Sequence, residues 1–305
     1  MVVTAAGAAE GAVRRWVDAA GGRLVLDGGL ATELEANGVD LNDPLWSAKC
    51  LLSSSHLIRK ASHPPNPKNP TLGVHMDYLE AGLNILITAS YQHPILVAAS
   101  IGSYGAYLAD GSEYSGDYGE AGTKEFLKDF HRWRLQVLAE AGPDLIAFET
   151  IPNKLEAQAC VELLEECNIN IPAWLSFNSK DGVHIVSGDS LIECATIADK
   201  CAKVGAVGIN CTPPRFIHGL ILSIRKVTDK PILIYPNSGE RYDGEKKEWV
   251  ESTGVSDGDF VSYVNEWCKD GASPIGGCCR TTPNTIRAIQ RTLNQGFNEQ
   301  HLPVA

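Results

Sequence analysis

Residues 206–214 read AVGINCTPP, and residues 273–280 read SPIGGCCR. Each stretch begins with a short apolar run of the kind that forms a buried strand, and each run leads into cysteine. The first stretch supplies Cys211, and the second supplies the adjacent pair Cys278 and Cys279. Because the strands of an α/β barrel end at one common rim, these two stretches predict a fold that brings three thiols together.

The same alternation of short strands and amphipathic helices runs through the chain from Leu24 onward, which is typical of a parallel sheet covered by helices. Strands are predicted at 23–26, 84–89, 94–99, 145–148, 172–177, 206–210, 231–235 and 273–275. Eight strands favour a (β/α)8 TIM-type barrel. A doubly wound open sheet is the competing fold, but no glycine-rich dinucleotide loop opens a helix in this chain.

Helices are predicted where apolar residues recur at spacings of three and four. These segments are 123–141, 154–167, 191–203, 216–227, 257–269 and 283–294. They follow the third to the eighth strand in regular order. We therefore expect a single domain over residues 1–305, with its core at about 20–295.

Polar residues follow most of the predicted strands, so the barrel is expected to gather them at its C-terminal rim. Asp27, Thr88, Glu149 and Asn237 are the candidates, and the two carboxylates suit a substrate that carries an ammonium group. Trp46 could offer an aromatic face to a sulfonium. Four of these residues have an ordinary structural alternative: Asp27 and Glu149 as acids at a helix N-cap or in its first turn, Trp46 as a core residue, and Asn237 as a loop residue.

Three thiolates are one ligand short of the closed zinc shell of a structural site, and this is typical of catalytic zinc with an open fourth position. Zinc keeps a bound thiol ionised, whereas only about 3% of a free thiol is ionised at pH 7. Three cysteinates leave the site with a charge of about −1, which favours a cationic donor such as a sulfonium. The hypothesis is therefore methyl transfer from a sulfonium to a thiol.

The remaining cysteines are interpreted as small hydrophobic residues of the core, namely Cys50, Cys160, Cys167, Cys194, Cys201 and Cys268. A disulfide between the adjacent Cys278 and Cys279 is the other alternative for that pair. It would strain the backbone and would require an oxidising compartment, for which the chain carries no signal.

Composition narrows the class of partner. The chain has 26 basic and 37 acidic residues, and a formal net charge of −11 argues against binding to nucleic acid or to an anionic membrane. It shows no secretory signal and no apolar run near 18 residues. The acidic balance therefore favours small-molecule substrates, and nine cysteines without a signal indicate reduced thiols and a cytoplasmic location.

Five motifs together resemble the zinc-dependent homocysteine S-methyltransferases, specifically the cobalamin-independent branch that uses S-methylmethionine. They are DGGLAT at 27–32, TASYQ at 88–92, FET at 148–150, GINC at 208–211 and GGCCR at 276–280. The resemblance implies one Zn²⁺ per chain on the three cysteines, with the homocysteine sulfur in the open position and methionine as the product. It also implies that Asp27, Thr88 and Glu149 contact the amino-acid part of homocysteine, with Trp46 near the donor.

The chain departs from that family pattern between residues 60 and 94. Only residues 90–93 separate the second predicted strand from the third, where the family has a long helical crossover and parallel strands need roughly a dozen residues. Four prolines in 61–70 also exclude a continuous helix there. The crossover between strands 2 and 3 is therefore expected to be missing.

Three interpretations stay open at this point: an active homocysteine S-methyltransferase, a barrel that has lost its activity, and a related zinc-thiolate methyltransferase with another acceptor. The donor could also be S-adenosylmethionine. No motif identifies a protein partner.

Overall fold

The computed structural model describes residues 7–36, 77–87, 96–108, 110–120, 122–243, 248–250 and 254–300. Seven parallel strands form one sheet in the order β1-β2-β3-β4-β5-β6-β9. Their bounds are β1 Ile85–Ile87, β2 Leu96–Gly102, β3 Leu145–Ile151, β4 Ala173–Phe177, β5 Val204–Asn210, β6 Ile232–Tyr235 and β9 Ala272–Ile275. Each lies at a strand predicted from the sequence.

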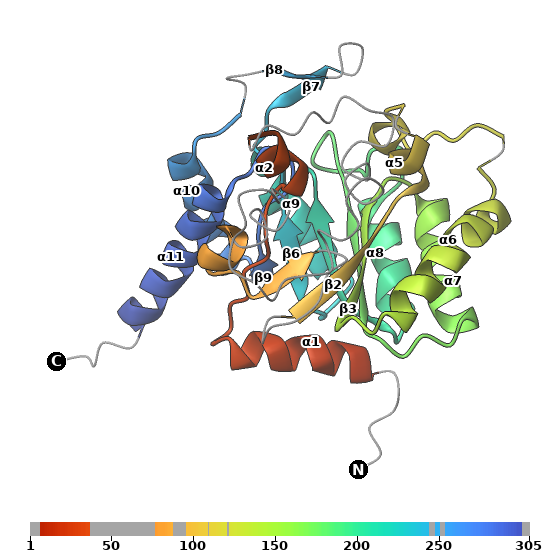
Figure 1. Ribbon diagram of the computed structural model, residues 1–305, viewed down its shortest axis with the longest axis horizontal. Coiled ribbons are helices and arrows are strands. Elements are labelled where there is room, and N and C mark those ends of the chain that lie inside the picture. Colours follow the sequence, from red (N-terminus) through yellow and green to blue (C-terminus); the bar gives the residue numbers. More distant parts are fainter. Residues whose placement is uncertain are drawn as a thin grey trace, which may run out of the picture.

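The eighth strand position is held by two residues that join the edges of this sheet. Val25 forms a parallel bridge with Ile275 of β9, and Leu26 forms one with Ile85 of β1. The backbone hydrogen bond from Leu26 N to Ile275 O is 2.9 Å long, and that from Ile85 N to Val25 O is 3.1 Å. The sheet therefore closes on itself, and the predicted barrel is confirmed (Figure 1).

The six predicted helices are present and surround the strands (Figure 1). They are α6 Lys124–Glu140, α7 Lys154–Glu166, α8 Leu191–Lys200, α9 Pro214–Arg225, α10 Asp257–Lys269 and α11 Pro283–Gln300. Side-chain caps explain why several begin where they do. Thr123, Asn153, Ser190 and Ser256 each accept a hydrogen bond from the backbone N–H three residues later.

Several elements were not predicted from the sequence. They are α1 Ala8–Ala19, α2 Leu30–Ala36, α5 Tyr104–Leu108, the 3-10 helix η3 Ser112–Tyr114, and the antiparallel pair β7 Arg241–Asp243 and β8 Glu248–Val250. Helix α1 lies across the N-terminal end of the barrel (Figure 1). Its Val13 belongs to the core of the barrel interior. The β7–β8 hairpin lies at the opposite end, beyond the carboxyl end of β6.

Residues along each strand alternate between two cores, as the period of two in a strand requires. On β3, Leu145 and Ala147 belong to the barrel interior, whereas Ile146 and Phe148 pack outward against the helices. Glu149, the next residue, therefore continues the interior row at the point where β3 reaches the rim. Because of this alternation, the side chain of Glu149 at the end of the strand lies on the interior side, where it can take part in a site.

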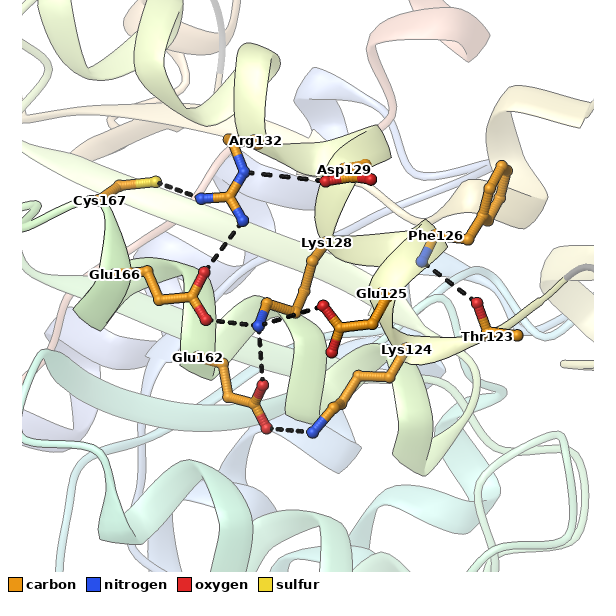
Figure 2. A network of polar contacts seen from close by, with 10 residues as sticks. All are labelled: Thr123, Lys124, Glu125, Phe126, Lys128, Asp129, Arg132, Glu162, Glu166 and Cys167. Atoms are coloured by element: carbon orange, nitrogen blue, oxygen red, sulfur yellow. Dashed lines mark hydrogen bonds and ion pairs between the residues drawn. The ribbon is translucent and has the colours of Figure 1, made fainter.

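Helix α6 has two different flanks. Figure 2 shows the flank that faces α7, where Lys128 lies between Glu162 and Glu166, with the Lys128 Nζ to Glu162 Oε2 distance at 3.1 Å. Trp133 and Val137 of the same helix lie away from this row and are 70% and 44% exposed. The helix thus combines a row of ion pairs toward α7 with exposed apolar side chains elsewhere.

The strands β1 and β2 are neighbours in the sheet. Those two strands pair in parallel, with Ile85 opposite Leu96, although only residues 88–95 separate them. Eight residues are fewer than the dozen that a crossover with a helix needs. The predicted loss of this crossover therefore fits the length of the connection. Within the described ranges, no helix combines the length and apolar character needed to cross a bilayer.

Candidate metal and substrate site

Cys211 stands at the junction between β5 and α9. The strand ends at Asn210, and Cys211 adopts a φ of +46°, which turns the chain sharply before the helix begins at Pro214. Its N–H donates to the carbonyl of Tyr235 at 3.2 Å. Thr212 secures the turn, since its hydroxyl donates to Asn210 O and accepts from the N–H of Ser179, both at 2.9 Å. The thiol is thus held at the rim by backbone contacts on both sides.

Cys278 and Cys279 follow β9 and are braced by the segment that follows β6. The N–H of Cys278 donates to Pro236 O at 2.8 Å, and Ser238 N donates to Cys279 O at 3.1 Å. On the other side, a Cβ at Gly29 would lie 2.7 Å from the Cys278 carbonyl oxygen, so only glycine fits there. The DGG motif therefore allows the first rim loop to approach the cysteine pair closely.

The three thiols form one cluster. All three Sγ atoms lie within 4.8 Å of one another, with Cys211 Sγ 3.6 Å and Cys278 Sγ 3.9 Å from Cys279 Sγ. Sulfurs around a tetrahedral zinc, at about 2.3 Å each from the metal, are about 3.8 Å apart. These two separations match that edge, so the donor set and its spacing fit a tetrahedral metal with three protein ligands.

The thiols also perturb one another. Hydrogen bonds with the two partner thiols, together with burial, raise the pKa of Cys211 well above its usual value. Hydrogen bonds with Cys211 and Cys278 lower the pKa of Cys279. Because repulsion prevents all three from ionising together at neutral pH, the cluster lacks a positive charge that a metal cation would supply.

Glu149 is the carboxylate at the end of β3. Its Oε1 accepts a hydrogen bond from Ser100 on β2, and its Oε2 accepts one of 3.1 Å from the hydroxyl of Tyr235 on β6. Burial is the main cause that raises the pKa of Glu149 to about 7, and the nearby Cys278 adds to it, while the two hydrogen bonds oppose it. This group therefore changes charge near neutral pH.

Asp27 lies at the first strand position and is 4% exposed. Its Oδ2 accepts the N–H of Ile87 at 3.0 Å, so the side chain joins the first rim loop to the end of β1. Burial, with a smaller contribution from Glu149, raises the pKa of Asp27 well above its usual value. The two predicted carboxylates are thus close enough to influence each other, and both lack a positive partner among the described residues.

Asn237 also lies at the rim, within the segment that braces the cysteine pair. Its Oδ1 accepts the N–H of Gly239 at 2.9 Å, which stabilises the turn after β6. Thr88, Trp46 and Cys50 lie outside the described residues. Their predicted roles stay predictions.

The other described cysteines are free thiols away from the cluster. Cys160, Cys194 and Cys201 belong to the core between the sheet and the helices, and Cys167 and Cys268 pack against it. These positions agree with the interpretation of these cysteines as small hydrophobic residues.

Sequence reasoning missed two contributors to this site. Tyr235 was recognised only as the end of a strand, although its parity with Leu233 could have placed its side chain in the interior. The loop between β2 and α6 was not recognised at all, yet Tyr114 Oη lies 4.0 Å from Cys211 Sγ. No local pattern signals a contact between residues 97 positions apart.

Known proteins that resemble this chain agree with the geometry. A family model described as Homocysteine S-methyltransferase matches residues 24–95 and 92–293 of this chain. The two matched segments meet at residues 92–95, within the short connection between β1 and β2. The interruption in the match coincides with the missing crossover.

Curated relatives match over nearly the whole chain. Homocysteine S-methyltransferase 3 of Zea mays is 77% identical, with 100% of each chain covered. That alignment runs over 351 positions against the 305 residues of this chain, so at least 46 residues of the maize protein have no counterpart here. Selenocysteine Se-methyltransferase of Brassica oleracea var. italica is 58% identical, covering 90% of this chain and 89% of its own.

A solved structure agrees with the fold. The homocysteine methyltransferase MmuM from Escherichia coli, in its metallated form, superposes with a TM-score of 0.72 at 34% identity. The match covers 88% of this chain and 95% of the bacterial one.

Proposed function

Because the chain belongs to the homocysteine S-methyltransferase family, and is therefore a methyltransferase, we propose that it transfers a methyl group from S-methylmethionine to homocysteine. The observation that carries this proposal is the cluster of Cys211, Cys278 and Cys279 at the barrel rim, with Sγ atoms within 4.8 Å of one another. Two carboxylates, Asp27 and Glu149, lie at the same rim. A cytoplasmic location is part of the proposal, because the described cysteines are free thiols, as in a reducing compartment.

Zn²⁺ is the metal that best suits three thiolates at tetrahedral spacing, and one ion per chain is proposed. When bound, it would hold the acceptor thiol in its ionised, nucleophilic form at neutral pH. The three cysteines supply the ligands, and the backbone hydrogen bonds of Cys211 and Cys278 keep them in place.

The amino-acid part of homocysteine is assigned to Asp27 and Glu149, with Thr88 as a further contact. Asp27 is buried and Glu149 is half-buried. Both lack a cationic partner among the described residues, and an ammonium group would supply one. Its charge would favour ionised Glu149, whose pKa of about 7 in the free protein falls as an opposite charge approaches. Trp46 and Asn237 are proposed as further substrate contacts.

The transfer itself requires alignment and no general base. The ionised sulfur of homocysteine provides the electron pair for the new S–CH₃ bond, while the old bond to the sulfonium breaks and its electrons remain on the donor sulfur. S-methylmethionine thereby becomes methionine, and homocysteine becomes a second methionine. The chain contributes by holding both sulfurs and the methyl group in line.

A two-by-two assay tests this proposal: homocysteine or cysteine as acceptor, with S-methylmethionine or S-adenosylmethionine as donor. Methionine formation from homocysteine and S-methylmethionine is expected, with loss of turnover in Cys211→Ser. Turnover with cysteine alone would overturn the assignment of the acceptor. Turnover with S-adenosylmethionine alone would overturn the assignment of the donor.

One observation favours a second acceptor class, a selenol. A relative that is 58% identical is named as a selenocysteine Se-methyltransferase. Adding selenocysteine to the assay separates the two, since a selenol enzyme would show a kcat/KM for selenocysteine well above that for homocysteine.

A further inference from the structure

The loop between β2 and α6 forms one wall of the site beside Cys211. It contains α5 and η3, and its Tyr114 Oη lies 4.0 Å from Cys211 Sγ. Gly105 of α5 packs so closely on η3 that a Cβ there would collide with the backbone of Glu113. The two short helices therefore behave as one packed unit at the rim.

A buried carboxylate on α7 holds this loop in place through hydrogen bonds. Glu156 is fully buried, and its Oε1 accepts the N–H of Tyr104 at 2.6 Å and lies 2.7 Å from His131 Nε2. Its Oε2 accepts the hydroxyl of Tyr118 at 2.6 Å. Because these contacts hold both ends of the loop, Glu113 and Tyr114 between them have fixed positions.

Two oxygen acceptors, one on this loop and one beside it, are buried and have no hydrogen-bond partner in the part of the chain that the structure describes. They are Oε2 of Glu113 and Oδ1 of Asn178. Asn178 is fully buried, and its Nδ2 donates to the backbone O of Glu113 at 2.7 Å, so the two residues are in direct contact. Because leaving buried acceptors unpaired is destabilising, a missing ligand is the natural explanation for both.

Asn178 also belongs to the interior side of the barrel. It follows β4, on which Trp174 lies in the interior core and Ser176 contacts Tyr235, and it continues that row at a spacing of two. Its amide therefore stands at the rim between Glu149 of β3 and Cys211 of β5, which flank β4 in the sheet.

The chemistry of these groups defines what would bind them. A carboxylate oxygen and an amide oxygen accept hydrogen bonds, and a negative carboxylate calls for a positive donor, so an ammonium group satisfies both. A sulfonium has no N–H and cannot. The aromatic ring of Tyr114, next to the thiol cluster, can instead face a sulfonium through its π surface.

We propose that Glu113, Asn178 and Tyr114 form the subsite for the cationic methyl donor, with Glu113 and Asn178 accepting the donor's ammonium group and Tyr114 facing its sulfonium. This inference rests on the proposed function and extends it to the second substrate. Homocysteine already has Asp27 and Glu149 assigned to its ammonium group. Glu113 and Asn178, on the β2–α6 side of Cys211, are then available to the ammonium group of the methyl donor. The sulfonium of that donor lies toward the thiols.

The test compares metal-loaded wild type, Glu113→Gln and Tyr114→Leu, with Glu120→Gln as the matched control, since Glu120 is an exposed acid on the same loop. Steady-state kinetics give KM for each substrate, and titration calorimetry with S-methylmethionine measures donor binding without turnover. Metal content and far-UV circular dichroism are recorded for every variant. Glu113→Gln keeps the shape of the side chain and removes only its charge.

Glu113→Gln is expected to raise KM and Kd for S-methylmethionine by about ten-fold or more, while KM for homocysteine changes less than about two-fold. Tyr114→Leu should also weaken the donor with its metal retained, and Glu120→Gln should match wild type. Unchanged donor binding in Glu113→Gln, or a rise in KM for homocysteine instead, would overturn the subsite. If wild type binds S-methylmethionine but does not turn over, the proposed function fails and the subsite stands.

Discussion

The hydroxyl of Tyr235 on β6 donates a hydrogen bond of 3.1 Å to Oε2 of Glu149 on β3. These strands are not neighbours in the sheet, so the contact crosses the barrel interior. The same hydroxyl oxygen lies 3.3 Å from Trp174 Nε1 and 2.5 Å from Ser176 Oγ on β4. Glu149 is therefore held in one position by a hydrogen-bonded row that begins deep in the barrel.

The ionisation of Glu149 should control homocysteine binding. Its pKa is about 7 in the free protein, and only the ionised form attracts an ammonium group, so affinity is fully present above pH 7 and declines as pH falls below it. Glu149→Gln cannot titrate. The ratio of KM for homocysteine in Glu149→Gln to that in wild type should fall by about ten-fold between pH 8 and pH 6.

Taking this ratio removes the effect of the homocysteine thiol, which titrates equally in both assays. A ratio that stays constant from pH 8 to pH 6 would show that Glu149 does not bind the ammonium group.

Tyr235→Phe removes a hydrogen bond that favours the ionised form of Glu149, so the pKa of Glu149 should rise further. The pH below which homocysteine affinity declines should therefore move upward. Ser176 and Trp174 also lose a partner, and the free energy of unfolding should fall by about 1–3 kcal/mol. Urea denaturation measures the second effect. An unchanged pH profile would contradict the link between Tyr235 and Glu149.

Glu156→Gln should loosen the β2–α6 loop, because a neutral amide cannot accept from Tyr104, Tyr118 and His131 as the carboxylate does. Hydrogen exchange is the measurement, and the amide of Tyr104 should exchange about ten-fold faster. Glu140→Gln, an exposed acid on α6, is the matched control and should leave exchange unchanged. Equal protection of Tyr104 in both variants would contradict the anchoring role.

The exposed flank of α6 that carries Trp133 and Val137 should bind hydrophobic dye. Trp133→Ser is expected to reduce the fluorescence of the dye ANS, and to change the free energy of unfolding by no more than about 0.5 kcal/mol because Trp133 is 70% exposed. Val183→Ser, at an exposed residue (61%) outside this flank, is the control. If both variants bind dye as wild type does, the α6 flank is not an accessible apolar surface.

The strands and the outer helices could be predicted because their residues repeat with periods of two and 3.6. Cys211, Cys278 and Cys279 could be grouped from their positions in the sequence, since strands that end at one rim bring their last residues together. Asp27 and Glu149 followed from the same rule, although the sequence could not show that Ser100 and Tyr235 hold Glu149 in place.

What escaped prediction depends on contacts between distant segments. Helix α1 looks like any amphipathic helix, and only packing reveals that Val13 enters the barrel interior. The strand predicted at 23–26 is present at its position, but only Val25 and Leu26 bridge to the neighbouring strands, and its short extent could not be predicted. Tyr114 lies in a loop whose order depends on the buried carboxylate of Glu156 and on a contact across the rim with Asn178, which itself follows a predicted strand.

The central claim is that the closed barrel holds one metal ion on three cysteines, and elemental analysis tests it most directly. Soluble purified wild type should contain about one zinc per chain, and Cys278→Ser, purified in parallel, should contain little or none. Circular dichroism of the variant confirms that its fold is retained. Folded wild type without zinc, or a Cys278→Ser protein with an undiminished zinc content, would contradict the account.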